Sequence, residues 1–221
     1  MTVLYEDNHI IIVSKSAGEI VQGDKTGDTP LSETVKLYIK EKYAKPGAVF
    51  LGVVHRLDRP VSGVVVFART SKALARLNEM FRTGAVQKTY WALVQNEPRQ
   101  SEATLTHYLV RNEQKNKSFA YDHERLGAKK AVLDYCVVGH SERYHLLEVH
   151  LHTGRHHQIR CQLSAIGCPI RGDLKYGAPR SNTDGSISLH ARSIRFEHPV
   201  SHQEIYVEAP PPMQGPWQAF L

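Results

Sequence analysis

The feature that most constrains the fold is a polar segment enclosed between two apolar ones. Residues 50–54 and 64–68 are apolar and rich in valine, which is typical of buried strands, whereas residues 55–63 read HRLDRPVSG. Pro60 and Gly63 force this polar segment to bend. The sequence therefore predicts two buried strands joined by a rigid loop that carries charged side chains.

The remaining segments are mostly short strand patterns with few helix patterns. A helix is expected after the Thr29–Pro30 pair, with Thr29 as its N-cap, and a second helix is expected from Ser71, as its N-cap, to Gly84. The apolar faces of these two helices and of a third, ended by Gly167, are Leu31, Val35, Tyr38 and Ile39; Leu74, Leu77 and Phe81; and Ile159, Leu163 and Ile166. Further strands are expected at residues 10–13, 88–94, 131–138, 144–151, 188–196 and 204–209.

Residues 96–130 are polar and lack a sustained period, so we expect an excursion over the surface, with a hairpin at Ala103–Leu109 at most, and we expect a partner to bind there. Many strands, few helices and hairpin-length connections favour an α+β fold with a mixed, mostly antiparallel central sheet and flanking helices and loops. We expect one domain over residues 1–221, without an N-terminal RNA-binding extension, and a monomer.

Composition narrows the function. The formal net charge of +6 favours a polyanionic partner, although charge alone does not identify a nucleic acid. Three cysteines without a CxxC pair disfavour a disulfide framework or a cysteine-rich zinc site, and they are expected to be reduced and mostly buried. No signal peptide and no apolar run of membrane-spanning length is found, so the chain is expected to be cytoplasmic, without a membrane partner.

Within the polar loop, Arg56 and Asp58 are two residues apart and therefore project to the same side of an extended backbone, while Leu57 turns into the core. A cation beside a carboxylate keeps the carboxylate ionised. A structural ion pair is the ordinary explanation for such residues, and His55 is expected to be a structural hydrogen-bonding histidine.

Four motifs in order alter that balance. HRLDRPVSG followed by VVVFARTSKA, then KTYWALV, then TGRHHQIR, and finally GCPIRGDLKYG with LHARSIRFEHP resemble the signature of the RluA-type pseudouridine synthases. These motifs span nearly the whole chain. The resemblance implies a pseudouridine-synthase-like catalytic domain, an isomerase that converts uridine to pseudouridine in structured ribosomal or transfer RNA, with no cofactor and no metal.

The resemblance also implies roles for individual residues. Asp58 is expected to be the catalytic carboxylate, Tyr90 the residue against the uracil ring and Arg160 the cation that holds Asp58. Substrate-binding residues are expected to be Arg56, Arg59, His157 and Lys88.

Three positions depart from the family pattern without removing a chemical role. Val61 stands in place of the usual threonine, Ser16 follows Lys15 where proline is usual, and His156 replaces the threonine of GRTHQIR.

The chemistry explains the choice of residue types. The reaction breaks an N-glycosidic bond and rejoins the uracil through carbon, so one ionised carboxylate suffices for attack on the sugar, attack on the base or removal of the 2′-proton. The sequence does not choose among these routes. The target base must be flipped out of its stack and held against an aromatic ring.

Three other functions compete with this interpretation. A catalytically silent RNA-binding or ribosome-assembly factor could share the fold. A metal site could use His150 and His152, which share a strand face, but no acid or cysteine stands at ligand spacing. A glycosidic hydrolase would need a second carboxylate, for which Asp173 is a poor candidate because it is expected to be structural.

Overall fold

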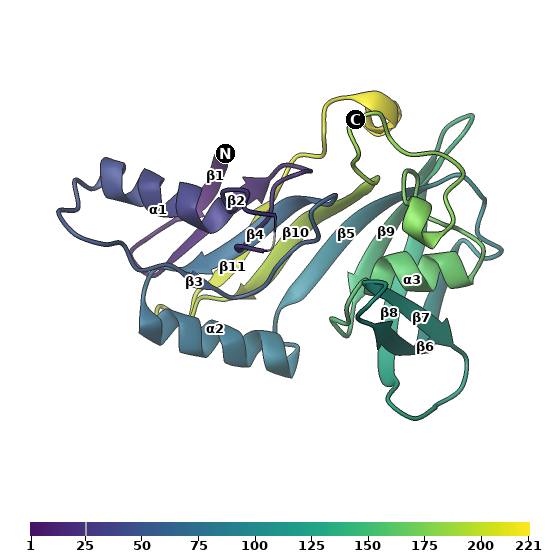
Figure 1. The fold of residues 1–221 in the computed structure, drawn as a ribbon, viewed down its shortest axis with the longest axis horizontal. Helices are drawn as coiled ribbons and strands as arrows, with labels where there is room; N and C mark the ends of the chain where they lie inside the picture. The colour runs from purple at the N-terminus through teal and green to yellow at the C-terminus, as the bar shows by residue number, and fades with distance from the viewer. Residues whose placement is uncertain (25) are drawn as a thin grey trace. The chain divides into compact units, whose positions relative to one another are not determined.

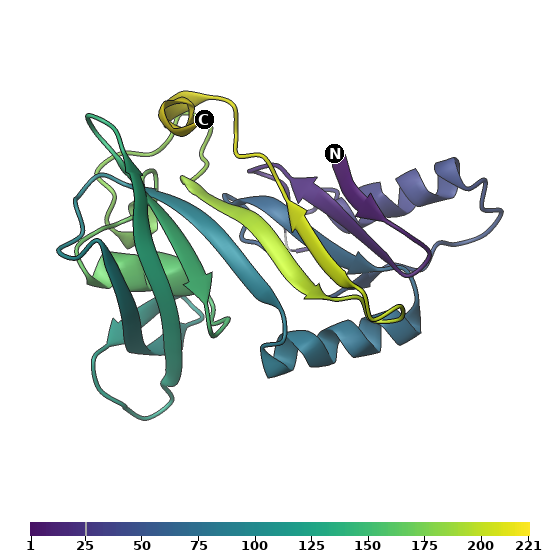
Figure 2. The same cartoon turned by 180° about the vertical axis from the view of Figure 1, so that it is seen from behind.

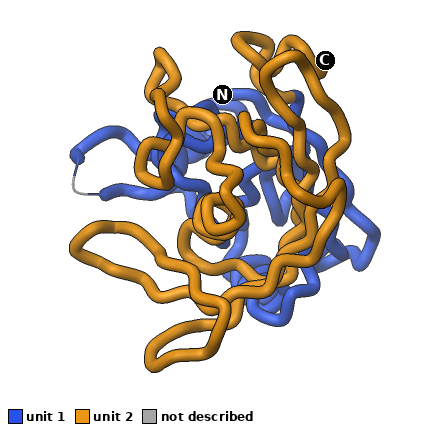
Figure 3. The backbone as a smooth tube through the Cα atoms, turned by 90° about the vertical axis from the view of Figure 1, so that its right-hand side faces the viewer, with its two compact units in different colours: residues 1–87, 192–210 blue, residues 88–191, 211–221 orange. Residues whose placement is uncertain are grey.

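The computed structural model describes residues 1–24 and 26–221, which divide into two compact units (Figure 3). Unit 1 comprises residues 1–87 and 192–210, and unit 2 comprises residues 88–191 and 211–221. Most strand pairs are antiparallel and the helices are few (Figure 1). This architecture confirms the α+β fold class with a mixed, mostly antiparallel sheet that the sequence predicted.

Unit 1 is a sheet with two helices. Its strands follow the order β1-β2-β4-β10, with β11 paired to β10 and β3 paired to β4. Figure 2 shows β10 and β11 side by side as an antiparallel hairpin. The elements are β1 (Thr2–Glu6), β2 (Ile10–Lys15), α1 (Leu31–Lys42), β3 (Gly52–Val53), β4 (Ser62–Ala68), α2 (Ser71–Thr83), β10 (Leu189–Glu197, which begins in unit 2) and β11 (Glu204–Glu208).

The core of unit 1 lies around β2 and β4. Every residue of Ile10–Val13 and of Val64–Ala68 is at most 2% exposed, as expected for apolar strands that are buried on both faces. Helix α2 packs Ala73 and Leu77 into this core, together with Ile194 and Phe196 of β10. The central strands therefore form a fixed base for the loop between β3 and β4.

Both predicted N-caps are wrong by one residue. Thr70, and not Ser71, caps α2, because its hydroxyl accepts a hydrogen bond from the Ala73 amide at 3.1 Å. Pro30, and not Thr29, precedes the first turn of α1, whose amides at Leu31 and Ser32 donate to backbone carbonyls of residues 20 and 21. A backbone segment thus satisfies the helix end that the sequence had assigned to a side chain.

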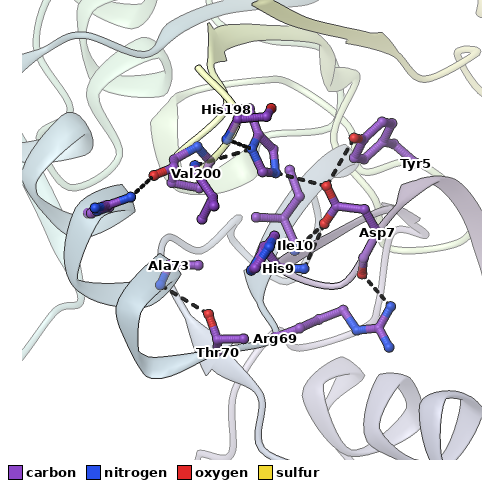
Figure 4. Close-up of polar contacts among 12 residues, drawn as sticks. Tyr5, Asp7, His9, Ile10, Arg69, Thr70, Ala73, His198 and Val200 are labelled. Carbon is purple, nitrogen blue, oxygen red and sulfur yellow. Dashed lines mark hydrogen bonds and ion pairs between the residues drawn. The ribbon is translucent and has the colours of Figure 1, made fainter. Parts of the chain in front are cut away.

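A buried histidine joins two turns of unit 1 (Figure 4). His198, which is 2% exposed, directs Nε2 to Asp7 Oδ2 at 2.8 Å, and its Nδ1 accepts from the amides of Val200 and Ser201. The other carboxylate oxygen of Asp7 accepts from the amides of His9 and Ile10 at 2.7 and 2.8 Å. Because Nδ1 accepts two hydrogen bonds, the N–H of the imidazole lies at Nε2 and faces Asp7.

Unit 2 contains an antiparallel sheet of strand order β5-β9-β8-β6-β7. Helix α3 lies across one face of this sheet (Figures 1 and 2). Its core packs Cys161 of α3 and Tyr176 against Leu109 and Ala131 of the sheet. The elements are β5 (Gln87–Val94), β6 (Glu102–Asn112), β7 (Lys117–Tyr121), β8 (Lys129–His140), β9 (His145–Leu151), α3 (Gln158–Ala165) and two 3-10 turns, η1 (Leu174–Tyr176) and η2 (Gly215–Phe220).

The expected excursion at residues 96–130 is wrong in its main part. The segment forms two paired strands, β6 and β7, and β6 also pairs with β8 from Glu102 to Leu109. Leu105, His107 and Leu109 alternate toward the helix side, where the His107 ring accepts from Gln162. The polar His107 at a buried position hides the period-2 pattern in the sequence.

The cysteines follow the prediction: all three are free, Cys161 and Cys168 are buried, and Cys136 is half-buried. In the described part of the chain, no helix combines the length and apolarity needed to cross a membrane.

Candidate active site

The polar loop predicted from the sequence connects β3 to β4 in unit 1. Leu57 is 7% exposed and turns into the core, while Arg56 is exposed and Asp58 is half-buried, as the alternation of an extended segment predicts. The Val61 amide donates to the Asp58 carbonyl at 3.0 Å and closes a turn directly after the aspartate. The following Gly63 has φ +119°, a backbone conformation that other residues rarely adopt.

A buried lysine binds the backbone of this loop. Lys15 at the end of β2 is 1% exposed, and its ammonium donates to the carbonyls of Val61 at 2.6 Å, Ser16 at 3.0 Å, Arg59 at 3.2 Å and Asp58 at 3.3 Å. Burial lowers the pKa of Lys15 to about 8, even though the charges of Glu19 and Asp58 favour protonation. The sequence analysis noted Lys15 only as part of a departure from the family pattern and missed this role.

His55 has the structural role expected from the sequence. Its Nε2 accepts a hydrogen bond from the Val66 amide at 3.0 Å, and its ring stacks on Phe81 with centroids 4.7 Å apart. Because that nitrogen accepts from the backbone, the histidine fixes the start of the loop against β4 and α2.

Arg59 is already engaged by the segment before α1. Its guanidinium donates to Asp28 at 2.6 Å and to Thr26 at 2.8 Å, and it lies 3.5 Å from Asp24. These contacts are exposed and therefore contribute little stability individually. They orient Arg59 toward Asp24, Thr26 and Asp28.

In unit 2, Lys88 and Tyr90 share one face of β5, since they are two residues apart in a strand. Tyr90 is 9% exposed and lies opposite Val149 of β9. Burial lowers the pKa of Lys88, and a Cβ atom added to Gly154 would lie 3.6 Å from its ammonium. The tyrosine and lysine expected at the substrate thus lie on one strand, next to the TGRHH segment.

Arg160 forms a buried ion pair within unit 2. Its Nε donates to Asp173 Oδ2 at 2.7 Å and its Nη2 to Asp173 Oδ1 at 2.9 Å, with side chains 6% and 1% exposed. The guanidinium also lies over the ring of Tyr176, 5.1 Å from its centroid. The sequence analysis did not predict this pair; it expected Asp173 to be structural and proposed Asp58 as the partner of Arg160.

His157 stands directly before α3 in the left-handed conformation, with φ +52°. It is 9% exposed, and its Nδ1 lies 2.9 Å from the Tyr176 hydroxyl, which accepts from the Ser118 amide at 2.8 Å. Burial raises the pKa of Tyr176 to about 12, so its hydroxyl stays protonated. The histidine expected to bind substrate therefore contacts Tyr176, the residue whose ring lies against the guanidinium of Arg160.

The two histidines considered for a metal site have separate partners. His150 lies 3.2 Å from Glu148, whereas His152 lies 2.5 Å from Asp134. No group of three or more His, Cys, Asp or Glu side chains is arranged to hold a metal ion in the described ranges 1–24 and 26–221.

The comparison with protein families agrees with the motifs. The model described as RNA pseudouridylate synthase matches residues 9–165, which include the Asp58 loop, β5 and all of α3. The structure of human RNA Pseudouridylate Synthase Domain Containing 4 is similar over 96% of this chain and 88% of that chain, with a TM-score of 0.79 and 25% identity.

Two curated relatives indicate the range of the family. The ribosomal large subunit pseudouridine synthase D of Xanthomonas campestris pv. campestris is 34% identical over 96% of this chain and 66% of that protein. The tRNA pseudouridine synthase C of Pectobacterium carotovorum is 29% identical over 100% of this chain and 61% of that protein. The chain spans about two thirds of the length of the curated relatives that it matches.

The ordered motifs, the fold of the sheet and these matches converge on one assignment. The chain belongs to the RNA pseudouridylate synthase family, a family of isomerases, as its sequence motifs predicted.

Proposed function

We propose that this chain isomerises uridine to pseudouridine in ribosomal or transfer RNA, with Asp58 as the catalytic carboxylate. The observation that carries the proposal is the Asp58 loop itself. The ammonium of Lys15 donates to the backbone carbonyls of residues 58, 59 and 61, so the carboxylate of Asp58 is carried by a loop of fixed conformation. A fixed, half-buried carboxylate is what a nucleophile or base requires.

The proposed reaction is balanced without an external reagent. The bond between uracil N1 and the sugar C1′ breaks, a bond between uracil C5 and C1′ forms, and the C5 proton leaves to water while N1 gains a proton. Asp58 serves in each of the three routes, by attacking C1′, attacking the base or removing the 2′-proton. The products are distinguished from those of a hydrolase by the absence of free uracil.

Roles for the other residues belong to the same proposal. Tyr90 packs against the flipped uracil, and Arg160 holds Asp58 in its ionised form. Arg56 and Lys88 contact the RNA backbone, and His157 and Arg59 contribute to substrate binding. Residues 1–221 act as a single catalytic domain, monomeric and cytoplasmic, and the names of the relatives support ribosomal or transfer RNA as substrate.

The structure offers no comparable support for hydrolysis. Both oxygens of Asp173 accept hydrogen bonds from Arg160, and its side chain is 1% exposed. A general acid must reach the leaving group and carry a proton. Asp173 is thus unsuited to be the second carboxylate.

The proposal is tested by mapping pseudouridine in total RNA from cells that lack the gene and carry either the wild-type chain, Asp58→Asn or Asp134→Asn. We expect one or more positions to be modified with the wild type and with Asp134→Asn, a partly exposed aspartate on β8, and to be unmodified with Asp58→Asn. A wild-type map identical to that of cells without the gene, with the protein still binding RNA, would identify a catalytically silent binder instead.

A further inference from the structure

We propose that the face of the β6–β7 hairpin turned away from α3 binds RNA outside the target uridine. This surface, the hairpin face, is made of aromatic and basic side chains: Tyr108, Lys117, Phe119, Tyr121, Arg125 and Lys130. The inference rests on the proposed function, because it takes RNA as the substrate. It adds a surface to which neither the motifs nor the comparisons give a role.

The strand register places these side chains on one face of the sheet in unit 2. Tyr108 lies opposite Tyr121 of β7 and opposite Lys130 of β8. Because side chains alternate along a strand, the neighbouring Leu109 and Ala120 point to the other face, where they belong to the core that contains residues of α3. Tyr108 and Tyr121 remain half-buried, so their rings are accessible from solvent.

The hairpin face lies on the opposite side of this sheet from Tyr90. Tyr90 is opposite Val149, Val149 is opposite Tyr135, and Tyr135 is opposite Ala103. Ala103 and Leu109 are an even number of positions apart in β6, so Tyr90 shares the face that α3 covers. The target base that Tyr90 is proposed to contact cannot at the same time lie on the hairpin face, which is therefore suited to another part of the RNA.

The chemistry of the hairpin face suits unpaired RNA. The guanidinium of Arg125 lies over the ring of Tyr121, 4.0 Å from its centroid, and the ammonium of Lys117 lies 5.6 Å from the centroid of Phe119. Aromatic rings and guanidinium planes stack on unpaired bases, while cations beside them bind the phosphates. Alternating rings and cations thus match the alternating bases and phosphates of a single strand.

Charge favours RNA over another partner. Residues 108–130 carry six basic and three acidic side chains, so they hold half of the formal net charge of +6. Among the residues that the structure describes, the three cations of the hairpin face have no carboxylate as an ion-pair partner. By contrast, Arg195, which lies over a tyrosine ring on β11, is paired with Glu204. A phosphate on the hairpin face has no protein carboxylate to displace.

The turn that adjoins the hairpin face presents an apolar tip. The Ala128 amide donates to the Arg125 carbonyl at 3.0 Å, and Gly127 has φ +76°, which closes a turn with glycine at its third position. Leu126, at the second position, is 101% exposed. A single exposed leucine is ordinary on a protein surface, but nucleic-acid-binding proteins insert such side chains between bases. Beside the stacked Arg125, Leu126 offers an apolar contact to an unstacked base.

The experiment compares two transcripts that contain a uridine identified by mapping, one with the whole surrounding RNA structure and one reduced to a stem–loop. Tyr121→Ala and Leu126→Ser should each raise the Kd of the long RNA about fivefold or more, as for the loss of a stacked base. Arg125→Gln should also lower the slope of log affinity against log salt by about 0.7, as for one phosphate contact. The kcat on the stem–loop should stay at the wild-type value for all three variants.

Three variants serve as matched controls. Arg195→Gln and Tyr206→Ala change a similar stack, with the guanidinium 4.8 Å from the ring centroid, that has carboxylate neighbours. Leu37→Ser changes a leucine of α1 that is 57% exposed. All three should bind both RNAs with the affinity and salt slope of the wild type.

Each result decides the question. Wild-type Kd and salt slope for the long RNA in every hairpin-face variant would overturn the inference, and so would losses shared equally by the stem–loop or by the controls. Altered self-association in sedimentation velocity with unchanged RNA binding would assign the face to a second copy of the chain instead. Where circular dichroism shows that Tyr121→Ala does not fold, the exposed Arg125 and Leu126 variants decide.

The inference and the proposed function fail in different ways. A wild type that forms no pseudouridine refutes the proposed function, and with it the ground for this inference. An active wild type whose hairpin-face variants bind the long RNA normally refutes only this inference.

Discussion

Lys15 is the single side chain on which the geometry of the Asp58 loop most depends. Its ammonium is buried and donates to carbonyls of the loop, and the cost of that burial appears as a pKa lowered to about 8. An apolar side chain of similar length would fill the space but leave these carbonyls without a donor. The residue thus exchanges stability for a defined loop conformation.

We predict two effects of Lys15→Met. Activity should fall at least tenfold, because the loop carbonyls lose their donor and Asp58 loses its fixed position. The pH dependence of stability should also change. The pKa of the lysine is about 10.4 in the unfolded chain and about 8 in the folded chain. Between these two pH values the unfolded state binds more protons, so the free energy of unfolding of the wild type rises with pH through this residue.

Urea unfolding at pH 7.5, 9 and 10 measures this effect. The difference in unfolding free energy between the wild type and Lys15→Met should shift in favour of the wild type as the pH rises. A difference that stays constant over this range would contradict the assignment of a depressed pKa to Lys15. Lys36→Met, which removes an exposed ion pair with Glu33 in α1, serves as the matched control.

At the scale of elements, the start of α2 depends on one hydroxyl. Thr70→Ala removes the acceptor of the Ala73 amide and should lower the free energy of unfolding by about 1 kcal/mol. Ser71→Ala alters an exposed residue that the sequence had named as the cap, and should change it by less than about 0.5 kcal/mol. Chemical denaturation of both variants checks the assignment, and a larger loss for Ser71→Ala would reverse it.

The turns joined by Asp7 should make unit 1 sensitive to acid. Burial tends to raise the pKa of Asp7, but hydrogen bonds from the His9 and Ile10 amides, together with the neighbouring His198 imidazole, outweigh it, so the pKa is lowered. A lowered folded pKa contributes stability that is present above the unfolded pKa of about 3.9 and is lost as the pH falls through the folded value.

Asp7→Asn should therefore differ most from the wild type above pH 5, with the difference in unfolding free energy shrinking toward pH 3. Urea unfolding at pH 6, 4.5 and 3 measures it. Asp122→Asn, at an 86% exposed side chain, is the control and should show no such trend. An equal gap at all three pH values would mean that Asp7 acts through packing rather than through its charge.

The elements with a clear hydrophobic period could be predicted from the sequence, whereas those that depend on a polar residue in the core could not. The strands around Ile10–Val13 and Val64–Ala68 and the loop between apolar strands were recognised because these two runs are apolar without interruption. Strand β6 was missed because His107 stands at a buried position and finds Gln162 as its partner. Gln162 is 55 residues away in the sequence, so no local pattern predicts this contact.

The same limit applies to the candidate site. Family motifs named Asp58, Tyr90 and Arg160, but they did not show what supports these residues. Lys15 reaches the Asp58 loop across more than 40 residues, and Asp173 reaches Arg160 from a separate turn. Such supporting contacts connect residues that are distant in sequence, and only the fold brings them together.

At the scale of the whole molecule, the formal net charge of +6 suits an enzyme that binds a polyanion. Binding of RNA should weaken as salt rises, because each neutralised phosphate releases counterions. Asp58→Asn removes one negative charge and no cation, so it should retain RNA binding while abolishing chemistry. Binding and catalysis should therefore be separable at Asp58.

The most direct test is a single-turnover measurement of tritium release from RNA containing 5-tritiated uridine, with the enzyme in excess over a target identified by mapping. We predict that the wild type releases tritium and forms pseudouridine in equal amounts without free uracil. Asp58→Asn should bind the same RNA but release tritium at least about a thousandfold more slowly, which is on the order of the loss seen when a nucleophile is removed. Pseudouridine formed by Asp58→Asn at the wild-type rate, or free uracil from the wild type, would contradict it.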